Sequence, residues 1–232
     1  MDLQNTDVLI QLKETALSAL SSCPSVLELC VFGSLAKDSY DAVSDIDLFV
    51  KCSNTENSTW IAASTLMLTL PVLYVRPFSS SDPPSSRYWF RNYPPFNKLD
   101  ISFHLAEEYD HILRHGVPGY IEEPYLRIQS SENKNRSQHA NSKTNMLSSP
   151  HSKTEAEMGK KLLRFLDCLK TLMRNKESSQ DLNEIAKSLQ SSLSTVEDLK
   201  FSGGDLIGLA ESALIHYKQM STPPNPSQKR KT

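Results

Sequence analysis

The sequence predicts an α+β fold in which a mixed β-sheet with helices is followed by a small helical bundle. Three observations support this prediction: strand-like apolar runs in the first half, an apolar-poor stretch after it, and apolar residues at helical spacing in the second half. We expect a first domain over residues 1–128, a disordered linker or loop over 129–153, a helical domain over 154–220 and a flexible tail over 221–232.

The first domain is expected to begin with an amphipathic helix. Residues 5–20 place apolar side chains at helical spacing, and residues 61–70 suggest a second, shorter helix. Sequential strands are expected to pair with one another. Strands are predicted at the apolar runs 26–32, 46–52, 72–75 and 99–105.

The second half is expected to pack as a bundle on the first domain. The stretch 130–153 is rich in Ser, Asn and Lys and has too few apolar residues to order itself. Beyond it, three apolar stripes at helical spacing predict three helices. The first stripe consists of Met158, Leu162, Phe165, Leu166, Leu169, Leu172 and Met173.

Composition narrows the functional classes. The 232 residues are 38% hydrophobic and 22% charged, which is typical of a soluble globular protein. No apolar run reaches the ~18 residues of a membrane span and the N-terminus lacks a signal-peptide pattern, so we expect a cytoplasmic protein that does not contact membranes. The four cysteines have no metal-ligand spacing and are expected to be reduced. A net charge of −2 disfavours nucleic acid as the main partner.

Three aspartates stand in apolar, strand-like surroundings. Asp45 and Asp47 are one residue apart at the start of the run 46–52. Because residues i and i+2 of a strand point to the same face, the two carboxylates project together. Like charges held side by side cost free energy unless a cation neutralises them, and carboxylate oxygens suit Mg²⁺. Asp100 begins another predicted strand, so the pattern predicts a metal site formed by three converging carboxylates.

A glycine-serine pair follows the first predicted strand. At Gly33 and Ser34 the backbone can approach a ligand closely, and free amide groups together with the serine hydroxyl can receive a phosphate. Taken alone, such a pair is usually a turn, and an isolated D-x-D is usually a solvated strand end. Together, the glycine-serine pair and the three aspartates predict an anionic ligand that binds with a metal ion.

These residues resemble the nucleotidyltransferase superfamily that includes DNA polymerase β, in its minimal and aminoglycoside-nucleotidyltransferase-like branch. The family signature is an apolar residue with Gly and Ser, a gap, Asp-apolar-Asp-apolar, and a third acid on a later strand. Residues 32–34, the ten-residue gap, residues 45–48 and Asp100 match it in order. Lys37 stands where many members carry arginine. The resemblance covers mainly residues 25–105.

The resemblance implies which residues would bind the nucleotide. Asp45 and Asp47 are expected to hold Mg²⁺ bound to the triphosphate of ATP or another NTP. The Gly33 amide and the Ser34 hydroxyl are expected to bind the β- and γ-phosphates. Lys37 assists there, unless it is an ordinary solvent-facing turn lysine.

Asp100 is implied to bind a second Mg²⁺ and to help deprotonate the acceptor hydroxyl, with Asp110 as the fallback third acid. The implied activity is transfer of a nucleoside monophosphate, AMP foremost, to a hydroxyl of a small molecule or protein, with release of pyrophosphate. The alternative is a catalytically inactive nucleotide-sensing or protein-binding module on the same fold. The oligomeric state is left open, a homodimer included.

Other polar and aromatic residues are interpreted structurally. Ser44 is expected to be a turn or cap residue. His111 and His115 are expected to form a surface or helix-end pair, because no third metal ligand accompanies them. The aromatic cluster 87–96 is assigned to core packing or loop anchoring in preference to stacking on a base. It belongs to a Ser/Pro-rich insertion, 79–96, in which no strand pattern is evident.

Overall fold

The computed structural model of the 232-residue chain describes residues 4–53, 58–77, 85–116, 126–129, 153–175, 180–194 and 205–221. The predicted linker and tail lie outside these residues, apart from residues at their ends. Within the described parts, six strands and six helices form a mixed sheet with helices and a C-terminal helical bundle, so the predicted α+β class is confirmed.

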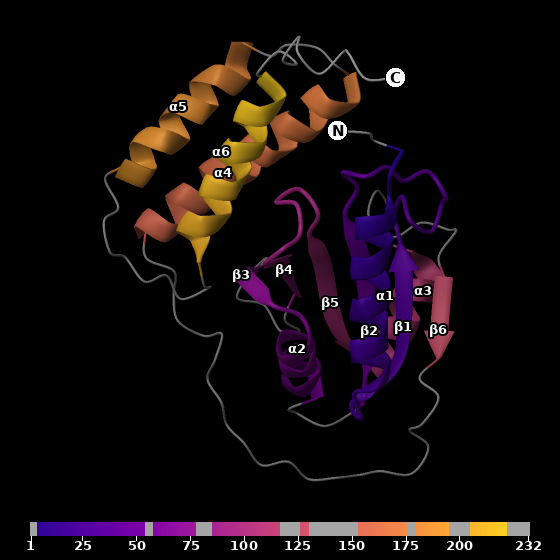
Figure 1. Cartoon of the computed structure of the whole chain (residues 1–232). Helices are drawn as coiled ribbons and strands as arrows, with labels where there is room; N and C mark the ends of the chain where they lie inside the picture. Colours follow the sequence, from indigo (N-terminus) through magenta and orange to yellow (C-terminus); the bar gives the residue numbers. More distant parts are fainter. Residues whose placement is uncertain are drawn as a thin grey trace.

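The elements follow one another in the order that Figure 1 shows by colour. The helices are α1 (Asp7–Ser21), α2 (Ser58–Thr69), α3 (Ala106–His115), α4 (Lys153–Asn175), α5 (Gln180–Ser194) and α6 (Leu206–Ser221). The strands are β1 (Val26–Phe32), β2 (Ile46–Cys52), β3 (Val72–Pro77), β4 (Ser85–Phe90), β5 (Leu99–Leu105) and β6 (Leu126–Gln129).

The sheet has the strand order β3-β4-β5-β2-β1-β6. The pairs β1/β2, β1/β6, β3/β4 and β4/β5 are antiparallel, whereas β2 and β5 are parallel. The expectation that sequential strands pair is therefore wrong for β2 and β3, because β5 returns to lie beside β2. As a result, β2 and β5 begin at the same edge of the sheet.

Strand β4 lies inside the insertion for which no strand was predicted. Tyr88 and Phe90 point into the core beneath α1 and α2, while Trp89 packs against the helical bundle on the opposite face. Because both faces are buried, the strand lacks the apolar-polar alternation by which strands are recognised. The interpretation of these aromatic residues as core residues is confirmed.

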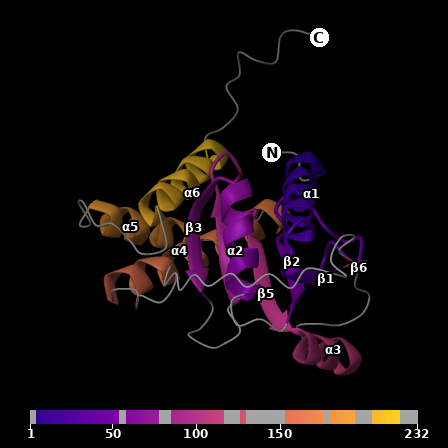
Figure 2. The same ribbon diagram turned by 90° about the horizontal axis from the view of Figure 1, so that it is seen from below.

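The two faces of the sheet are covered differently (Figures 1 and 2). On one face, α1 and α2 close a continuous apolar core. On the other, α4, α5 and α6 pack against Tyr74, Trp89 and Phe96 near β3 and β4, and α3 packs against Phe49 near β1 and β2. The strip of sheet between the bundle and α3 carries the predicted site residues.

Two further findings concern the cysteines and the helices. The four cysteines form no disulfide, and Cys23, Cys30 and Cys52 are buried, which agrees with the expected packing. In the part of the chain that the structure describes, none of the helices is long and apolar enough for a membrane span.

Candidate active site

The fold brings the three predicted aspartates together. Asp47 on β2 lies directly opposite Asp100 on β5 in the parallel register, and Asp45 precedes Asp47 by two residues. Burial and the negative charges of Asp100 and Asp45 raise the pKa of Asp47 from 3.8 to about 7. Burial is the main cause of this shift, and repulsion from the two neighbouring carboxylates adds to it. The structure therefore produces the arrangement predicted from the spacing, and their roles in metal binding and catalysis stay predictions.

Gly33 directly follows β1 and lies beside Asp47. Its φ is +70°, and a Cβ added there would lie only 2.5 Å from Asp47 Oδ2. Both facts favour glycine at this position. The turn that follows is closed by the Lys37 amide, which donates to the Gly33 carbonyl at 3.2 Å, and by the Ser39 amide, which donates to the Ser34 carbonyl at 3.0 Å. Gly33 thus lies at the acidic site, and Ser34 follows it in the turn.

Lys37 lies on the exposed side of this turn. Its ammonium group makes no hydrogen bond or ion pair with any residue that the structure describes. The contribution of Lys37 to phosphate binding is therefore still a prediction.

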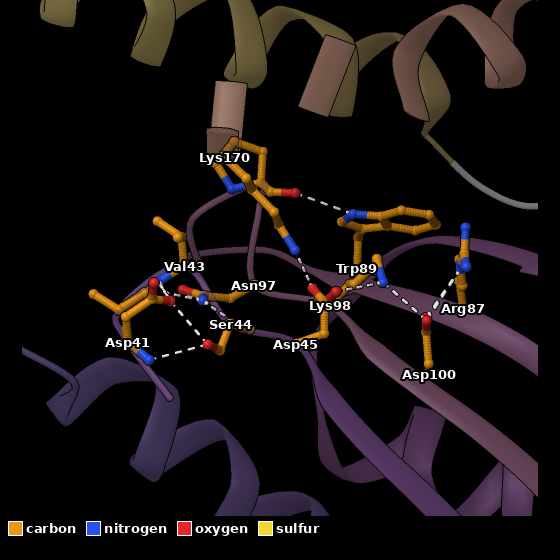
Figure 3. Close-up of polar contacts among 12 residues, drawn as sticks. Asp41, Val43, Ser44, Asp45, Arg87, Trp89, Asn97, Lys98, Asp100 and Lys170 are labelled. Atoms are coloured by element: carbon orange, nitrogen blue, oxygen red, sulfur yellow. Dashed lines mark hydrogen bonds and ion pairs between the residues drawn. The ribbon is translucent and has the colours of Figure 1, made fainter. Parts of the chain in front are cut away.

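Three cations contact the aspartates (Figure 3). Lys98 Nζ lies 2.8 Å from Asp45 Oδ2 and 2.8 Å from Asp100 Oδ2. Lys170, on α4, forms an ion pair with Asp45 Oδ1. Arg87 Nε, on β4, lies 3.2 Å from both carboxylate oxygens of Asp100. The bundle therefore contributes a charged side chain directly to the acidic site.

Sequence reasoning did not assign these cations to the site. Lys98 stands two residues before Asp100, so the alternation argument used for Asp45 and Asp47 could have found it. Lys170 is 125 residues from Asp45, and only the docking of the bundle places it there.

The pKa values of Lys98 and Lys170 shift in opposite directions. Burial lowers the pKa of Lys98, but attraction to Asp45 and Asp100 outweighs it, so the pKa is raised. Burial and the positive charge of Lys98 lower the pKa of Lys170 despite its pairing with Asp45. Burial also raises the pKa of Asp100 in spite of its cationic neighbours. Lys98 is thus the central counter-charge of the site.

Hydrogen bonds from Arg174 on α4 and from Asn97 hold the loop before β2 in place. Arg174, one turn beyond Lys170 on α4, binds Asp41 with two nitrogens at 2.7 and 3.0 Å. Asn97 Nδ2 donates to the carbonyls of Ala42 and Ser44 at 2.9 and 3.2 Å. The Ser44 hydroxyl donates to Asp41 Oδ1 at 2.8 Å, which confirms its structural role. These bonds fix the point from which Asp45 projects.

The carboxylate oxygens of the site are of the kind that binds Mg²⁺, although the ammonium groups of Lys98 and Lys170 contact them in this structure. Among the described residues, no group of three His, Cys, Asp or Glu side chains has the arrangement of a metal site. Lys98 bridges Asp45 and Asp100. Burial raises the pKa of Asp47, and the charges of Asp100 and Asp45 add to this rise. Carboxylate oxygens are the preferred ligands of Mg²⁺. For these carboxylates to bind a divalent cation, the ammonium group of Lys98 would have to move aside.

The remaining sequence candidates lie elsewhere. Asp110, on α3, accepts two hydrogen bonds from Lys51 Nζ at 2.8 Å, so it is Asp100 that joins the other two acids. His111 and His115 are exposed at the end of α3 with ring centroids 4.6 Å apart, and they form the helix-end pair that was expected.

Residues 11–134 match the model of a family described as a nucleotidyltransferase domain. This range is more than half of the chain and includes the glycine, the serine and the three aspartates. No curated protein sequence matches the chain.

Two solved structures are similar to the chain at low identity. One is the "structure of GLD-2/RNP-8 complex", with 20% identity and a TM-score of 0.33, aligned over 44% of this chain and 35% of that chain. The other is the "Crystal structure of putative nucleotidyltransferase from H. pylori", with 13% identity and a TM-score of 0.27, aligned over 94% of this chain and 98% of that chain. The present chain thus spans about a third of the first of these proteins.

Proposed function

Because the chain belongs to the nucleotidyltransferase-domain family, we propose that it is a Mg²⁺-dependent enzyme that transfers a nucleoside monophosphate, AMP from ATP, to a hydroxyl group of another molecule. The observation that supports this proposal most strongly is the meeting of Asp45, Asp47 and Asp100 on neighbouring strands beside Gly33. A small molecule or a protein would serve as acceptor.

On the donor side, Asp45 and Asp47 would hold Mg²⁺, which supplies charge neutralisation for the phosphates. The amide of Gly33 and the hydroxyl of Ser34 would donate hydrogen bonds to the terminal phosphates. When a divalent cation neutralises Asp45, the ammonium of Lys170 loses its anionic partner, and a phosphate oxygen offers a replacement. The existing ion pair thus keeps a phosphate-binding group in place without nucleotide.

On the acceptor side, Asp100 would accept the proton of the acceptor hydroxyl. Its pKa is raised by burial, which makes it a better base than an exposed aspartate, and Arg87 Nε fixes its orientation from 3.2 Å. The acceptor oxygen forms a bond to the α-phosphorus, and the bond to pyrophosphate breaks. Most of the rate enhancement would come from positioning and charge neutralisation.

The lysine pairs favour a second candidate, a nucleotide-sensing or protein-binding module without catalysis. Lys98 and Lys170 already neutralise much of the acidic cluster, so the fold does not need a metal for stability. In that case the carboxylates and lysines would act as a structural ion-pair network between the sheet and the bundle.

The thermal midpoint of the purified protein separates a site that binds nucleotide with Mg²⁺ from a protein-binding module that does not, and turnover then separates an enzyme from a nucleotide sensor. It would be measured with ATP, GTP, CTP and UTP, each with and without Mg²⁺, for the wild type, Asp47→Asn and Asp110→Asn. The enzyme proposal predicts a Mg²⁺-dependent rise with one nucleotide in the wild type and in Asp110→Asn, the matched control outside the site, and no rise in Asp47→Asn. Equal behaviour of wild type and Asp47→Asn would contradict the proposal.

A further inference from the structure

A row of charged residues crosses the sheet at the site. In the strand registers, Arg76 on β3 pairs with Arg87 on β4, Arg87 with Asp100 on β5, and Asp100 with Asp47 on β2. Directly paired residues point to the same face and lie on strands about 4.8 Å apart. The row therefore has two acids at one end and two arginines at the other.

Arg76 is half-buried and forms no ion pair with a carboxylate among the described residues. Its Nη1 is buried without a hydrogen-bond partner among the described residues. Burial and the positive charge of Arg87 lower the pKa of Arg76, although Tyr74 opposes this. Arg87, in contrast, is paired with Asp100. A buried donor that carries charge and lacks a partner costs free energy, and an anion between the two arginines would remove that cost.

Where the helical bundle packs over Arg76, helix α4 has a glycine. Gly159, on α4, is buried, and a Cβ added there would lie 3.5 Å from Arg76 Nη1. An alanine would fit without a clash, yet its methyl group would occupy the space beside the guanidinium. Glycine at this position thus lets α4 pass close to Arg76 with no side chain between them.

The position of the arginines relative to the acids indicates what the anion belongs to. Gly33 and Ser34 follow β1, on one side of the acid pair, whereas β3 and β4 lie on the other side, next to Asp100. In the proposed function, the donor phosphates occupy the first side and the acceptor hydroxyl lies at Asp100. Two strand spacings of about 4.8 Å place Arg76 roughly 10 Å from Asp100. This is the span of one small molecule.

We propose that Arg76 and Arg87 form an acceptor subsite for a small molecule that carries a phosphate or carboxylate within roughly 10 Å of its reacting hydroxyl, the span of two strand spacings. This inference rests on the proposed function and specifies its acceptor class. Guanidinium groups bind both anions through paired hydrogen bonds. The hydroxyl oxygen attacks the α-phosphorus, its proton passes to Asp100 and pyrophosphate leaves with the electron pair of the broken bond.

The experiment uses inorganic phosphate and acetate as probes on the full chain. Mg²⁺ and a non-hydrolysable ATP analogue are first added to saturation, and the midpoint shift they cause tests the donor site by itself. Phosphate or acetate is then titrated, and the further shift gives the affinity of the second anion site. We expect Arg76→Gln to retain the first shift and to weaken the second affinity about tenfold or more. Arg91→Gln, an exposed arginine beyond β4, is the matched control and should behave as the wild type.

Gly159→Ala keeps the test decisive if Arg76→Gln does not fold. Alanine favours the helix over glycine, so this variant should be at least as stable as the wild type, and its anion affinity should fall. No second shift in the wild type, or equal anion affinities in the wild type, Arg76→Gln and Gly159→Ala, would overturn the subsite. A shift with an RNA oligonucleotide but with neither small anion would also overturn it. Failure of the first shift alone would instead count against the proposed donor site.

Discussion

The two faces of the central sheet differ in what they bury, and strand β5 belongs to both. Ile101 and Phe103 point into the apolar core under α1 and α2, while Asp100 and His104 point to the face shared by the bundle and α3. The first face buries mainly apolar groups, which stabilise the fold. The second buries charges that oppose one another. Stability and proposed function therefore reside on opposite sides of the same strands, and each side can be changed separately.

The largest effect on stability is expected from the apolar face. Ile101 is 1% exposed, so Ile101→Ala should lower the free energy of unfolding by about 3 kcal/mol through lost burial and a cavity. Urea denaturation followed by circular dichroism measures this. Nucleotide binding by the folded fraction should be unchanged, and a loss of binding in the folded protein would show that the two faces are coupled.

Gly33→Ala tests the contact between the turn and the acids. The new Cβ would lie 2.5 Å from Asp47 Oδ2 on a backbone with φ of +70°. We expect a loss of about 2 kcal/mol of stability together with displacement of Asp47 and loss of nucleotide binding. Denaturation and nucleotide titration on the same preparation check both effects. Wild-type values in both would contradict the close packing of Gly33 on Asp47.

Asp47→Asn should change stability and binding in opposite directions. Burial, together with the charges of Asp100 and Asp45, raises the pKa of Asp47, so its charge opposes folding at neutral pH in the absence of metal. Removing the charge should stabilise the metal-free protein by about 1 kcal/mol and abolish Mg²⁺-dependent nucleotide binding. Thermal unfolding in EDTA and in Mg²⁺ with nucleotide measures the two effects. A destabilised metal-free variant would argue against repulsion among the carboxylates.

The smallest effect is expected from His104, which is buried against Phe49 with ring centroids 4.0 Å apart. Burial lowers its pKa although Glu108, with Oε2 3.1 Å from Nδ1, opposes this. The unfolded chain therefore binds a proton near pH 6.5 that the folded chain resists, and stability is lost as pH falls below 6.5.

His104→Phe should remove this part of the pH dependence. The difference from the wild type is at most about 1.4 kcal/mol per pH unit, the limit for one titrating group. Urea unfolding at several values between pH 7 and pH 5 checks it. The same slope in both proteins would show that His104 does not contribute.

The local part of the site could be predicted from the sequence. Alternation along a strand decides that Asp45 and Asp47 project together, and Gly33 could be recognised because few residues tolerate such a turn. The same reasoning could have identified Lys98 beside Asp100. These inferences need only the geometry of one strand and its adjoining turn.

The non-local part could not be predicted. The parallel pairing of β2 with β5 and the contact between Lys170 and Asp45 depend on how distant segments pack. Strand β4 was missed because burial on both faces removes its alternation. The pairing of Arg76 with Arg87 likewise becomes visible only when the register of β3 and β4 is known.

The most direct test of the central claim is the rate of pyrophosphate release from the preferred nucleotide, with Mg²⁺ and a low-molecular-weight cell extract as the source of acceptors. Wild type, Asp100→Asn and Asp110→Asn would be compared after each is shown to be folded. We predict release by the wild type and by Asp110→Asn. The rate for Asp100→Asn, which lacks the general base, should be lower by a factor of about a hundred or more. Equal rates for Asp100→Asn and the wild type would contradict the assignment of this site as the catalytic centre.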